Sequence, residues 1–491
     1  MSQGIEIRLK DHSMLHINCE SHCAAELAEH FCFDVPGAKY MPAYKRKVWD
    51  GKIRLFNRMN GEINAGLLKQ IQKFAKYRRY PIKYVETKYG IPGETNEVNH
   101  MEMLKWIAKI NTPFLPRDYQ YDAFTHAIKN KRALLVSPTG SGKSFIIYLI
   151  LRWYISCFDK KVLIVVPTTG LVEQMYKDFE VYGFDADKHC HKIYSGKDKD
   201  TDKQIIISTW QSISKLPPAW FHKFGCVFGD ECHGFKAKSL SSIMNKSINA
   251  EYRFGTTGTL DGTQTHEMVL EGLFGPVEKV TTTVQLQEEN ALAKLDIDII
   301  LLEYDEPTRD RLYNATYQEE IDFLVSYEKR NNFIRNLACS LDGNTLVLFN
   351  LVEKHGKVLR DLIEDKLENG RRLFYVSGET KTSDREAVRK IIEKQSNAVV
   401  LASLGTFSTG INIRNLHNIV FASPSKSQIR VLQSIGRGLR IAEDGRDTRL
   451  YDIADDLRSK GKPNFTLRHS AERIKIYAKE QFPHKVSKVK I

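Results

Sequence analysis

The sequence has little of what a secreted or membrane-spanning protein needs. Its eight cysteines are scattered over 491 residues. We therefore expect a reducing compartment and no disulfide framework. No uninterrupted apolar run is long enough to cross a bilayer, and the N-terminus lacks a basic-then-apolar signal pattern. With 42% apolar and 27% charged residues, we expect a globular protein of roughly three domains in the cytoplasm, the host cytoplasm if viral.

Acidic residues are scarce at both ends of the chain. Residues 1–90 hold 16 Lys/Arg and 9 Asp/Glu, and residues 456–491 hold 10 and 3, so each end carries +7. Because the whole chain carries +13, the segment between them carries −1. Basic ends beside a near-neutral centre favour a polyanion-binding enzyme, since Lys and Arg bind phosphate backbones without reading sequence. Ordinary solvated lysine surface is the alternative.

From Leu115 onward, short apolar runs alternate with helical stretches, and they do so in two blocks. Such alternation predicts two α/β domains with parallel sheets covered by helices. Residues 304–343 are expected to be helical. The expected strands are 132–138, 161–168, 204–210, 225–231, 344–350, 371–377, 398–403 and 418–423.

The first 88 residues predict a small α+β domain. The segment "KVWDGKIRLFN" (47–57) places alternating apolar residues around Asp-Gly, a strong hairpin signal. Residues 66–80 predict an amphipathic helix with a basic exposed side. The Gly-, Pro- and polar-rich stretch at 88–100 is typical of a linker, and residues 466–482 predict a basic amphipathic helix.

The segment "SPTGSGKS" (137–144) follows an expected strand and precedes an apolar helix. In that context Gly140 and Gly142 let backbone N–H groups close around phosphate oxygens at the positive end of a helix. Lys143 can reach the β- and γ-phosphates of ATP, and the Ser144 hydroxyl can ligate Mg²⁺. Ser137 departs from the strict pattern, which has Gly there. The expected ATP-binding residues are Ser137, Pro138, Thr139, Gly140, Ser141, Gly142, Lys143 and Ser144.

A phosphate site of this type needs an acid to hold the metal and a group to position the attacking water. The strand-like run "CVFGDE" supplies both, because it ends in Asp230-Glu231. We expect Asp230 to hold Mg²⁺ with Ser144, and Glu231 to orient or deprotonate the water. The neighbouring Cys232 and His233 also raise the possibilities of a metal cluster or a nucleophile, which the phosphate site makes unnecessary.

Several motifs occur in an order that resembles superfamily 2 helicases of the DExH type. The strongest are "SPTGSGKS", "DECH" (230–233) and "QSIGRGLR" (433–440); "RDYQ" (117–120), "VPTTGLVEQ" (166–174), "STWQSI" (208–213), "TTGT" (256–259), "LVLFN" (346–350) and "ASLGTFSTGINI" (402–413) accompany them. The match spans residues 117–440. Asn412 departs from the family, many of whose members have an acid at this position.

The resemblance assigns roles to further residues. It implies that Arg117 and Gln120 bind the adenine, and that Gln433 partners His233. Arg437 and Arg440, three apart on one helical face, would stabilise charge on the transferred phosphoryl group when the two α/β domains close. The implied nucleic-acid contacts in the two α/β domains are Thr168, Thr209, Asn350 and Ser403.

The resemblance also implies the domain plan: two tandem RecA-like parallel-sheet domains with a small N-terminal α+β domain. The expected segments are an accessory DNA-binding domain at 1–88, a linker at 89–111, helicase domain 1 at 112–283, a connecting helical region at 284–330, helicase domain 2 at 331–455 and a basic C-terminal helix or tail at 456–491.

The segments "YKRKVWDGKIRLFN" and "RIKIYAKEQF" extend the resemblance to phage recombination and repair helicases. This implies an ATP- and Mg²⁺-dependent DNA helicase, or translocase, acting on forks, Holliday junctions and R-loops, with replication or recombination proteins as possible partners. An RNA-directed helicase with a similar core stays open. So does a nucleic-acid annealing protein whose ATPase is secondary.

The N-terminal region holds three further candidate sites. Cations with aromatic neighbours suit phosphate contact and base stacking; they are Lys45, Arg46, Lys47, Lys52, Arg54 and Arg58, with Tyr44 and Trp49 among them. Trp49 could equally be a core residue. The histidines and cysteines between His12 and Cys32 could bind zinc, but they lack a C-x₂-C pair and fit a helix with a buried side better. A nuclease built from Asp50, Glu86 and Lys88 lacks convergent carboxylates.

Overall fold

The computed structural model describes most of the chain from residue 4 to residue 491. The residues it does not describe are 1–3, 195, 235–236, 259, 261–263, 290–291, 369, 381–383, 385–386, 389–390, 393, 407–414 and 424–444. Contacts divide the chain into two compact units. The first comprises Met1–Ser137 with Gly142–Thr281, and the second comprises Pro138–Ser141 with Thr282–Ile491.

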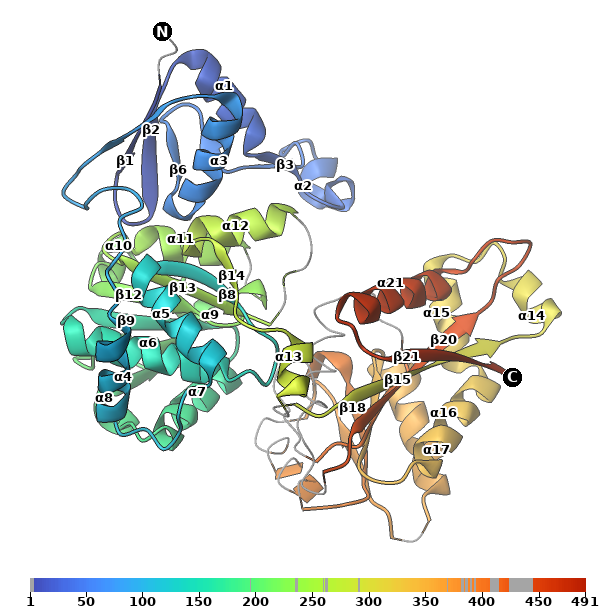
Figure 1. Cartoon of the computed structure of the whole chain (residues 1–491). Helices are drawn as coiled ribbons and strands as arrows, with labels where there is room; N and C mark the ends of the chain where they lie inside the picture. The colour runs from blue at the N-terminus through green and yellow to red at the C-terminus, as the bar shows by residue number, and fades with distance from the viewer. Residues whose placement is uncertain are drawn as a thin grey trace. The chain divides into compact units, whose positions relative to one another are not determined.

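The first unit begins with a five-stranded sheet in the order β5-β6-β2-β1-β7, drawn in blue in Figure 1. Alternate apolar residues of these strands pack against α1 (Ser21–His30) and α3 (Leu68–Arg78). This confirms the small N-terminal α+β domain. The strands are β1 (Ile5–Leu9), β2 (Met14–Asn18), β5 (Phe56–Asn57), β6 (Glu62–Asn64) and β7 (Ile82–Val85).

The hairpin expected around Asp50-Gly51 is wrong. The strand after the turn, β4 (Lys52–Arg54), pairs antiparallel with β3 (Cys32–Asp34) instead of with residues 47–49. Two local features keep 47–49 out of a strand: the short helix α2 (Pro42–Lys45) precedes them, and Lys47 adopts a left-handed φ of 57°. The Trp49 indole N–H instead donates to the Lys52 carbonyl at 2.8 Å.

The expected linker at 89–111 contains a helix, α4 (His100–Lys109). The Asn99 side chain caps it by accepting from the Met101 and Glu102 backbone N–H groups. Ile107 of this helix is buried in the core of the following α/β domain. The irregular connection is therefore shorter than expected, because the apolar face of α4 finds a core to pack against.

The α/β domain of the first unit is built on a seven-stranded parallel sheet in the order β10-β11-β9-β12-β13-β8-β14. Its strands are β8 (Arg132–Val136), β9 (Lys161–Val166), β10 (Cys190–Ile193), β11 (Ile205–Thr209), β12 (Phe224–Gly229), β13 (Tyr252–Thr257) and β14 (Val277–Lys279). Its helices are α5 (Asp118–Asn130), α6 (Lys143–Cys157), α7 (Thr169–Val181), α8 (Ala186–His189), α9 (Trp210–Ile213), α10 (Pro218–Phe221), α11 (Ala237–Lys246) and α12 (Gln264–Phe274). Helix α6 is apolar on nearly every side, which is why it lies buried in this core.

The second unit contains another seven-stranded parallel sheet, in the order β17-β18-β16-β19-β20-β15-β21. The strands are β15 (Leu295–Glu303), β16 (Thr345–Phe349), β17 (Leu373–Val376), β18 (Val399–Ser403), β19 (Asn418–Phe421), β20 (Thr448–Asp456) and β21 (His484–Lys490). The described helices include α13 (Thr283–Glu288), α14 (Glu306–Arg311), α15 (Tyr317–Ser326), α16 (Glu328–Ser340), α17 (Lys357–Lys366) and α21 (Phe465–Lys479). Two RecA-like parallel sheets are thus confirmed.

Two expectations about the second unit need correction. The region 284–330 is not a purely helical connection, because β15 lies within the sheet between β20 and β21. The C-terminal segment 456–491 is more than a helix or tail, because β21 adds the strand beyond β15. Helix α21 itself lies where the amphipathic pattern predicts it.

Buried ion pairs attach two helices to β20. The Arg330 side chain of α16 donates to the Asp455 carboxylate at 2.8 Å, and Arg473 of α21 donates to Asp452 at 2.7 Å. Tyr477 also donates to Asp452 at 2.8 Å. Since these ionic side chains are almost wholly buried, removing one partner would leave an uncompensated charge in the core.

Candidate ATP and nucleic-acid site

The phosphate loop connects β8 to α6, as the sequence predicts. Gly140 and Gly142 both take left-handed φ values, 87° and 79°. A Cβ on Gly142 would lie 2.4 Å from Nε2 of Gln120, so only glycine fits there without displacing that side chain. The Ser141 hydroxyl closes the turn by donating to the Pro138 carbonyl at 2.7 Å.

Lys143, the first residue of α6, projects toward the acidic pair. Its Nζ lies 3.2 Å from the Ser137 carbonyl and 3.6 Å from Oε1 of Glu231. The lysine and glutamate side chains are only 12% and 23% exposed, so their attraction is less screened than at an open surface. The loop lysine and the acid of "DECH" therefore share one site.

Asp230 and Glu231 follow the buried strand β12. Burial, followed by the charge of Glu231, raises the pKa of Asp230 to about 6. Three groups act in the opposite direction: the Thr256 hydroxyl, which donates to Asp230 at 2.6 Å, the charge of Lys143, and the Glu231 N–H, which donates at 2.9 Å. Two neighbouring carboxyl groups in such a site favour a bound cation, because the cation would offset their repulsion.

Glu231 takes a left-handed φ of 47°, which is uncommon for a residue with a Cβ. Such backbone conformations cost about 1–3 kcal/mol and are found at functional sites, where the surroundings hold them in place. The turn separates the two acids, so that Asp230 faces Thr256 while Glu231 faces Lys143.

His233 contacts the strand next to β12. Its Nδ1 lies 2.6 Å from the Thr257 hydroxyl and 3.4 Å from Oε2 of Glu231. Its expected pairing with Gln433 concerns a residue outside the described segments, as do Arg437 and Arg440, so those roles stay predictions. Cys232 is buried, which raises the pKa of its thiol well above the ordinary value and makes it a poor nucleophile.

The expected adenine-binding segment lies at the start of α5. The Gln120 side chain accepts from the Arg117 backbone N–H at 3.0 Å and lies against Gly142. Phe114, which is 46% exposed, lies edge-on to Tyr182 with ring centroids 5.9 Å apart. Arg117, Gln120 and the phosphate-loop glycine thus come together in the first unit.

The four expected nucleic-acid contacts lie at or just beyond strand ends. Thr168 precedes α7 and accepts from the Leu171 N–H at 3.4 Å, and the Thr209 hydroxyl lies 2.9 Å from that of Ser212. Thr168 follows β9 and Thr209 ends β11, and these two strands are neighbours in the first sheet. In the second sheet, Asn350 follows β16 and Ser403 ends its neighbour β18.

The six N-terminal cations are all exposed, and they form two groups. The first group comprises Lys45, Arg46, Lys47 and Arg58. In the second group, Arg54 forms a bidentate pair with Asp50, whose pKa that hydrogen bond lowers to about 2, and Lys52 lies 4.0 Å from Asp34. The exposed apolar residues beside the first group include Tyr40, Met41, Tyr44, Val48 and Met59.

Sequence reasoning missed three contacts at the ATP site. Thr256 and Thr257 were placed in a motif, but nothing assigned them to Asp230 and His233. Tyr182 belonged to no motif, yet its hydroxyl lies 2.9 Å from that of Ser144. A buried polar residue at the end of a strand is the only signal that could have pointed to the threonines.

The described segments offer neither a further metal centre nor a membrane span. They contain no group of three or more His, Cys, Asp or Glu side chains arranged to hold a metal ion. None of their helices combines the length and the apolar composition that a bilayer crossing requires.

Three family models match successive parts of the chain. "DNA helicase UvsW, N-terminal" matches residues 4–85, "Type III restriction enzyme, res subunit" matches 113–262, and "Helicase conserved C-terminal domain" matches 328–442. Together with the two parallel sheets and the phosphate loop, they define a superfamily 2 helicase that hydrolyses ATP.

Full-length comparison then identifies the family. The ATP-dependent DNA helicase uvsW of Enterobacteria phage T4 is 34% identical over 509 aligned residues, covering 99% of this chain and 100% of the relative. A crystal structure of T4 UvsW matches with a TM-score of 0.53 at 33% identity, covering 99% of this chain and 100% of its own. The probable helicase D10 of Escherichia phage T5 is 23% identical, covering 65% of this chain and 66% of its own. The chain belongs to the UvsW family and is an ATP-dependent DNA helicase.

Proposed function

We propose that this helicase remodels branched DNA (forks, Holliday junctions and R-loops) during recombination, repair and replication in the host cytoplasm. The observation that carries the proposal is the full-length similarity to a phage DNA helicase, which includes the N-terminal domain as well as the motor. An RNA-directed role would need the same motor, but it would not explain why the N-terminal domain is shared with a DNA helicase.

The ATP site supports specific roles for its residues. Lys143 neutralises the β- and γ-phosphates, while Arg117 and Gln120 bind the adenine beside the loop. Glu231 holds the attacking water and accepts its proton. Its carboxylate lies 3.6 Å from the Lys143 ammonium group and therefore next to the expected phosphates. His233 positions Glu231 and links it to Thr257.

The residues at this site fit a magnesium ion. Asp230 has a raised pKa beside a second carboxylate, and such a pair favours a divalent cation. Asp230 and the Ser144 hydroxyl are the oxygen donors that would hold it. Mg²⁺ bound there would neutralise charge on the phosphate oxygens of ATP during hydrolysis. Arg437 and Arg440 would stabilise the charge that remains on the transferred group.

Substitution of the loop lysine tests the assignment of the ATP site. Lys143→Ala should abolish DNA-stimulated ATP hydrolysis and leave DNA binding largely intact, because Lys143 neutralises phosphate charge and the expected DNA contacts lie elsewhere. ATP turnover and DNA binding would be measured on the same preparation, across single-stranded, duplex, forked and four-way DNA and RNA. Full turnover in the variant would overturn the assignment. Equal stimulation by RNA and branched DNA would instead refute the substrate proposal alone.

The N-terminal cations are proposed to contact the DNA backbone. Lys45, Arg46 and Lys47 are exposed at the end of α2, beside the exposed ring of Tyr44. Changing the three cations to Gln should lower DNA affinity and reduce the slope of log affinity against log salt by up to about 3, since each phosphate contact contributes about 0.9. The matched control is Lys73→Gln, an exposed cation on α3. An unchanged slope in the triple variant would show that these cations do not contact the DNA backbone.

A further inference from the structure

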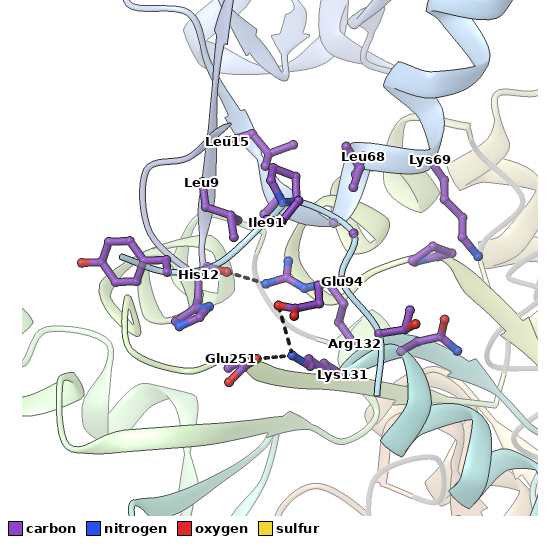
Figure 2. Close-up of a pocket in the computed structure, with 18 of the residues that line it drawn as sticks. Leu9, His12, Leu15, Leu68, Lys69, Ile91, Glu94, Lys131, Arg132 and Glu251 are labelled. Carbon is purple, nitrogen blue, oxygen red and sulfur yellow. Dashed lines mark hydrogen bonds and ion pairs between the residues drawn. The ribbon is translucent and has the colours of Figure 1, made fainter. Parts of the chain in front are cut away.

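A cavity of about 180 Å³ lies where the N-terminal domain meets the α/β domain of the first unit. Figure 2 shows its lining. Leu9, Leu15 and Leu68 come from the N-terminal domain, and Ile91 comes from the connection after β7. The charged lining comes from several elements: Lys69 of α3, Glu94 of the connection, Lys131 and Arg132 around the start of β8, and Glu251 just before β13. The cavity therefore combines apolar and charged lining.

The acids of the cavity are already engaged. Glu251 lies 2.6 Å from the Lys131 ammonium group, and Glu94 lies 3.9 Å from the same atom. Together with Lys69 and Arg132, the lining holds three cations and two acids, so its formal balance is positive. Both acids face the same lysine, which leaves Arg132 without a carboxylate in contact among the described residues.

Arg132 has an unused donor. Its Nη2 donates to the His12 carbonyl at 2.5 Å, while its Nη1 is buried and has no hydrogen-bond partner among the described residues. Burial lowers the pKa of Arg132 to about 10, and the more distant charges of Glu251 and Asp11 do not offset it. A buried guanidinium without a counter-ion is costly, and an anion would remove that cost.

The side chains next to Arg132 lie in the same buried, positively charged environment. Burial lowers the pKa of His12 to about 4, and the charges of Arg132 and Arg253 act in the same direction, against that of Glu251. Arg253, itself buried at this junction, donates to backbone carbonyls and to the Ser13 hydroxyl. His12 is therefore neutral at pH 7 and adds no charge, so Arg132 supplies the cationic charge here that has an unused donor.

We propose that this cavity binds a small oxyanion, a phosphate or a carboxylate, with Nη1 of Arg132 as its principal donor and Lys69 as a supporting cation. Guanidinium groups recognise both kinds of oxyanion with directed hydrogen bonds. A water molecule could satisfy the N–H but would leave the charge uncompensated. The proposal does not depend on which DNA the helicase remodels.

The position gives the ligand a mechanical role. Arg132 is the first residue of β8, whose last residue, Val136, directly precedes the phosphate-loop residue Ser137. The same cavity touches the connection that carries Ile91 and the N-terminal helix that carries Leu68. An oxyanion held there would fasten the N-terminal domain to the strand that leads into the ATP site.

Calorimetric titration of the full chain with inorganic phosphate, and separately with malonate, tests the proposal. The protein is first saturated with a non-hydrolysable ATP analogue and Mg²⁺, so that the phosphate loop is already filled. We expect saturable binding of one equivalent of at least one probe, and the probe that binds decides between phosphate and carboxylate. Arg132→Gln should weaken it at least about tenfold, because a hydrogen bond to a charged group is lost. Absence of saturable binding by both probes, or equal affinity in the variant, would overturn the proposal.

A second pair of variants guards against misfolding of Arg132→Gln. Lys69 and Lys73 are both exposed on α3, but only Lys69 lines the cavity. Lys69→Glu should weaken the oxyanion severalfold, whereas Lys73→Glu makes the same charge change on the same helix and should have little effect. Equal affinities in these two variants would show that the bound anion lies elsewhere.

Discussion

Replacing Thr256 by Val should move the acidic limb of the pH profile for ATP hydrolysis. Asp230 must be ionised to hold a cation, and its pKa is raised to about 6, chiefly by burial. The Thr256 hydroxyl works against this shift by donating to Asp230 at 2.6 Å. Val keeps the shape of the side chain but loses the donor, so the pKa of Asp230 should rise further.

The size of the shift follows from the hydrogen bond that is lost. A buried hydrogen bond to a charged group contributes about 1.5–3 kcal/mol, and one pKa unit corresponds to about 1.36 kcal/mol. The limb should therefore move from near pH 6 to about pH 7–8. The measurement is kcat/KM for Mg·ATP against pH, because this ratio reports ionisations of the free enzyme.

Thr257→Val is the matched control. It removes the hydroxyl that contacts His233 at 2.6 Å and leaves the hydrogen bond from Thr256 to Asp230 in place. Its acidic limb should stay near that of the unmodified protein even if its rate falls. An unshifted limb in Thr256→Val, or equal shifts in both variants, would refute the view that Asp230 ionisation sets the limb.

Two further substitutions test other parts of the structure. Asp452→Ala leaves Arg473 buried without its carboxylate and should cost about 3–5 kcal/mol, lowering the melting temperature; adding Arg473→Leu should recover part of the loss, and an unchanged melt of the single variant would contradict the argument. Tyr182→Phe removes the oxygen that lies 2.9 Å from the Ser144 hydroxyl and can accept a hydrogen bond from it when Ser144 binds Mg²⁺. The variant should need about 10–100-fold more Mg²⁺ to bind a fluorescent ATP analogue, and an unchanged Mg²⁺ titration would refute that role.

The phosphate loop and the acidic pair of the ATP site could be predicted because each is formed by consecutive residues. A strand, a glycine-rich turn and a helix that begins at Lys143 define the phosphate loop without knowledge of the rest of the fold. The strand before Asp230 was equally clear. The contacts between such segments could not be predicted: Thr256 is 26 residues from Asp230, and Tyr182 is 38 from Ser144. A single threonine or tyrosine has no sequence pattern that indicates which distant residue it contacts.

In the fold, too, features set by consecutive residues could be predicted, and pairings between distant segments could not. Continuous apolar runs such as Lys161–Val166 revealed buried parallel strands, and those strands lie where the sequence predicts them. The Asp50-Gly51 hairpin failed because β4 pairs with β3, which local turn signals cannot anticipate. The strand β21 was missed because most of its residues are exposed and it pairs with β15, far away in the sequence.

The outermost strand of the second sheet has a consequence for association between molecules. β21 is an edge strand, and its sequence "HKVSKVK" places a lysine at 485, 488 and 490. Two of these lysines lie over acids of β15, at 3.1 Å from Asp298 and 2.8 Å from Glu303. A strand of another molecule that extended the sheet would have to approach these lysines and desolvate them. The seven residues that complete the sheet thus also line its free edge with charged side chains, an arrangement that disfavours pairing with a second copy.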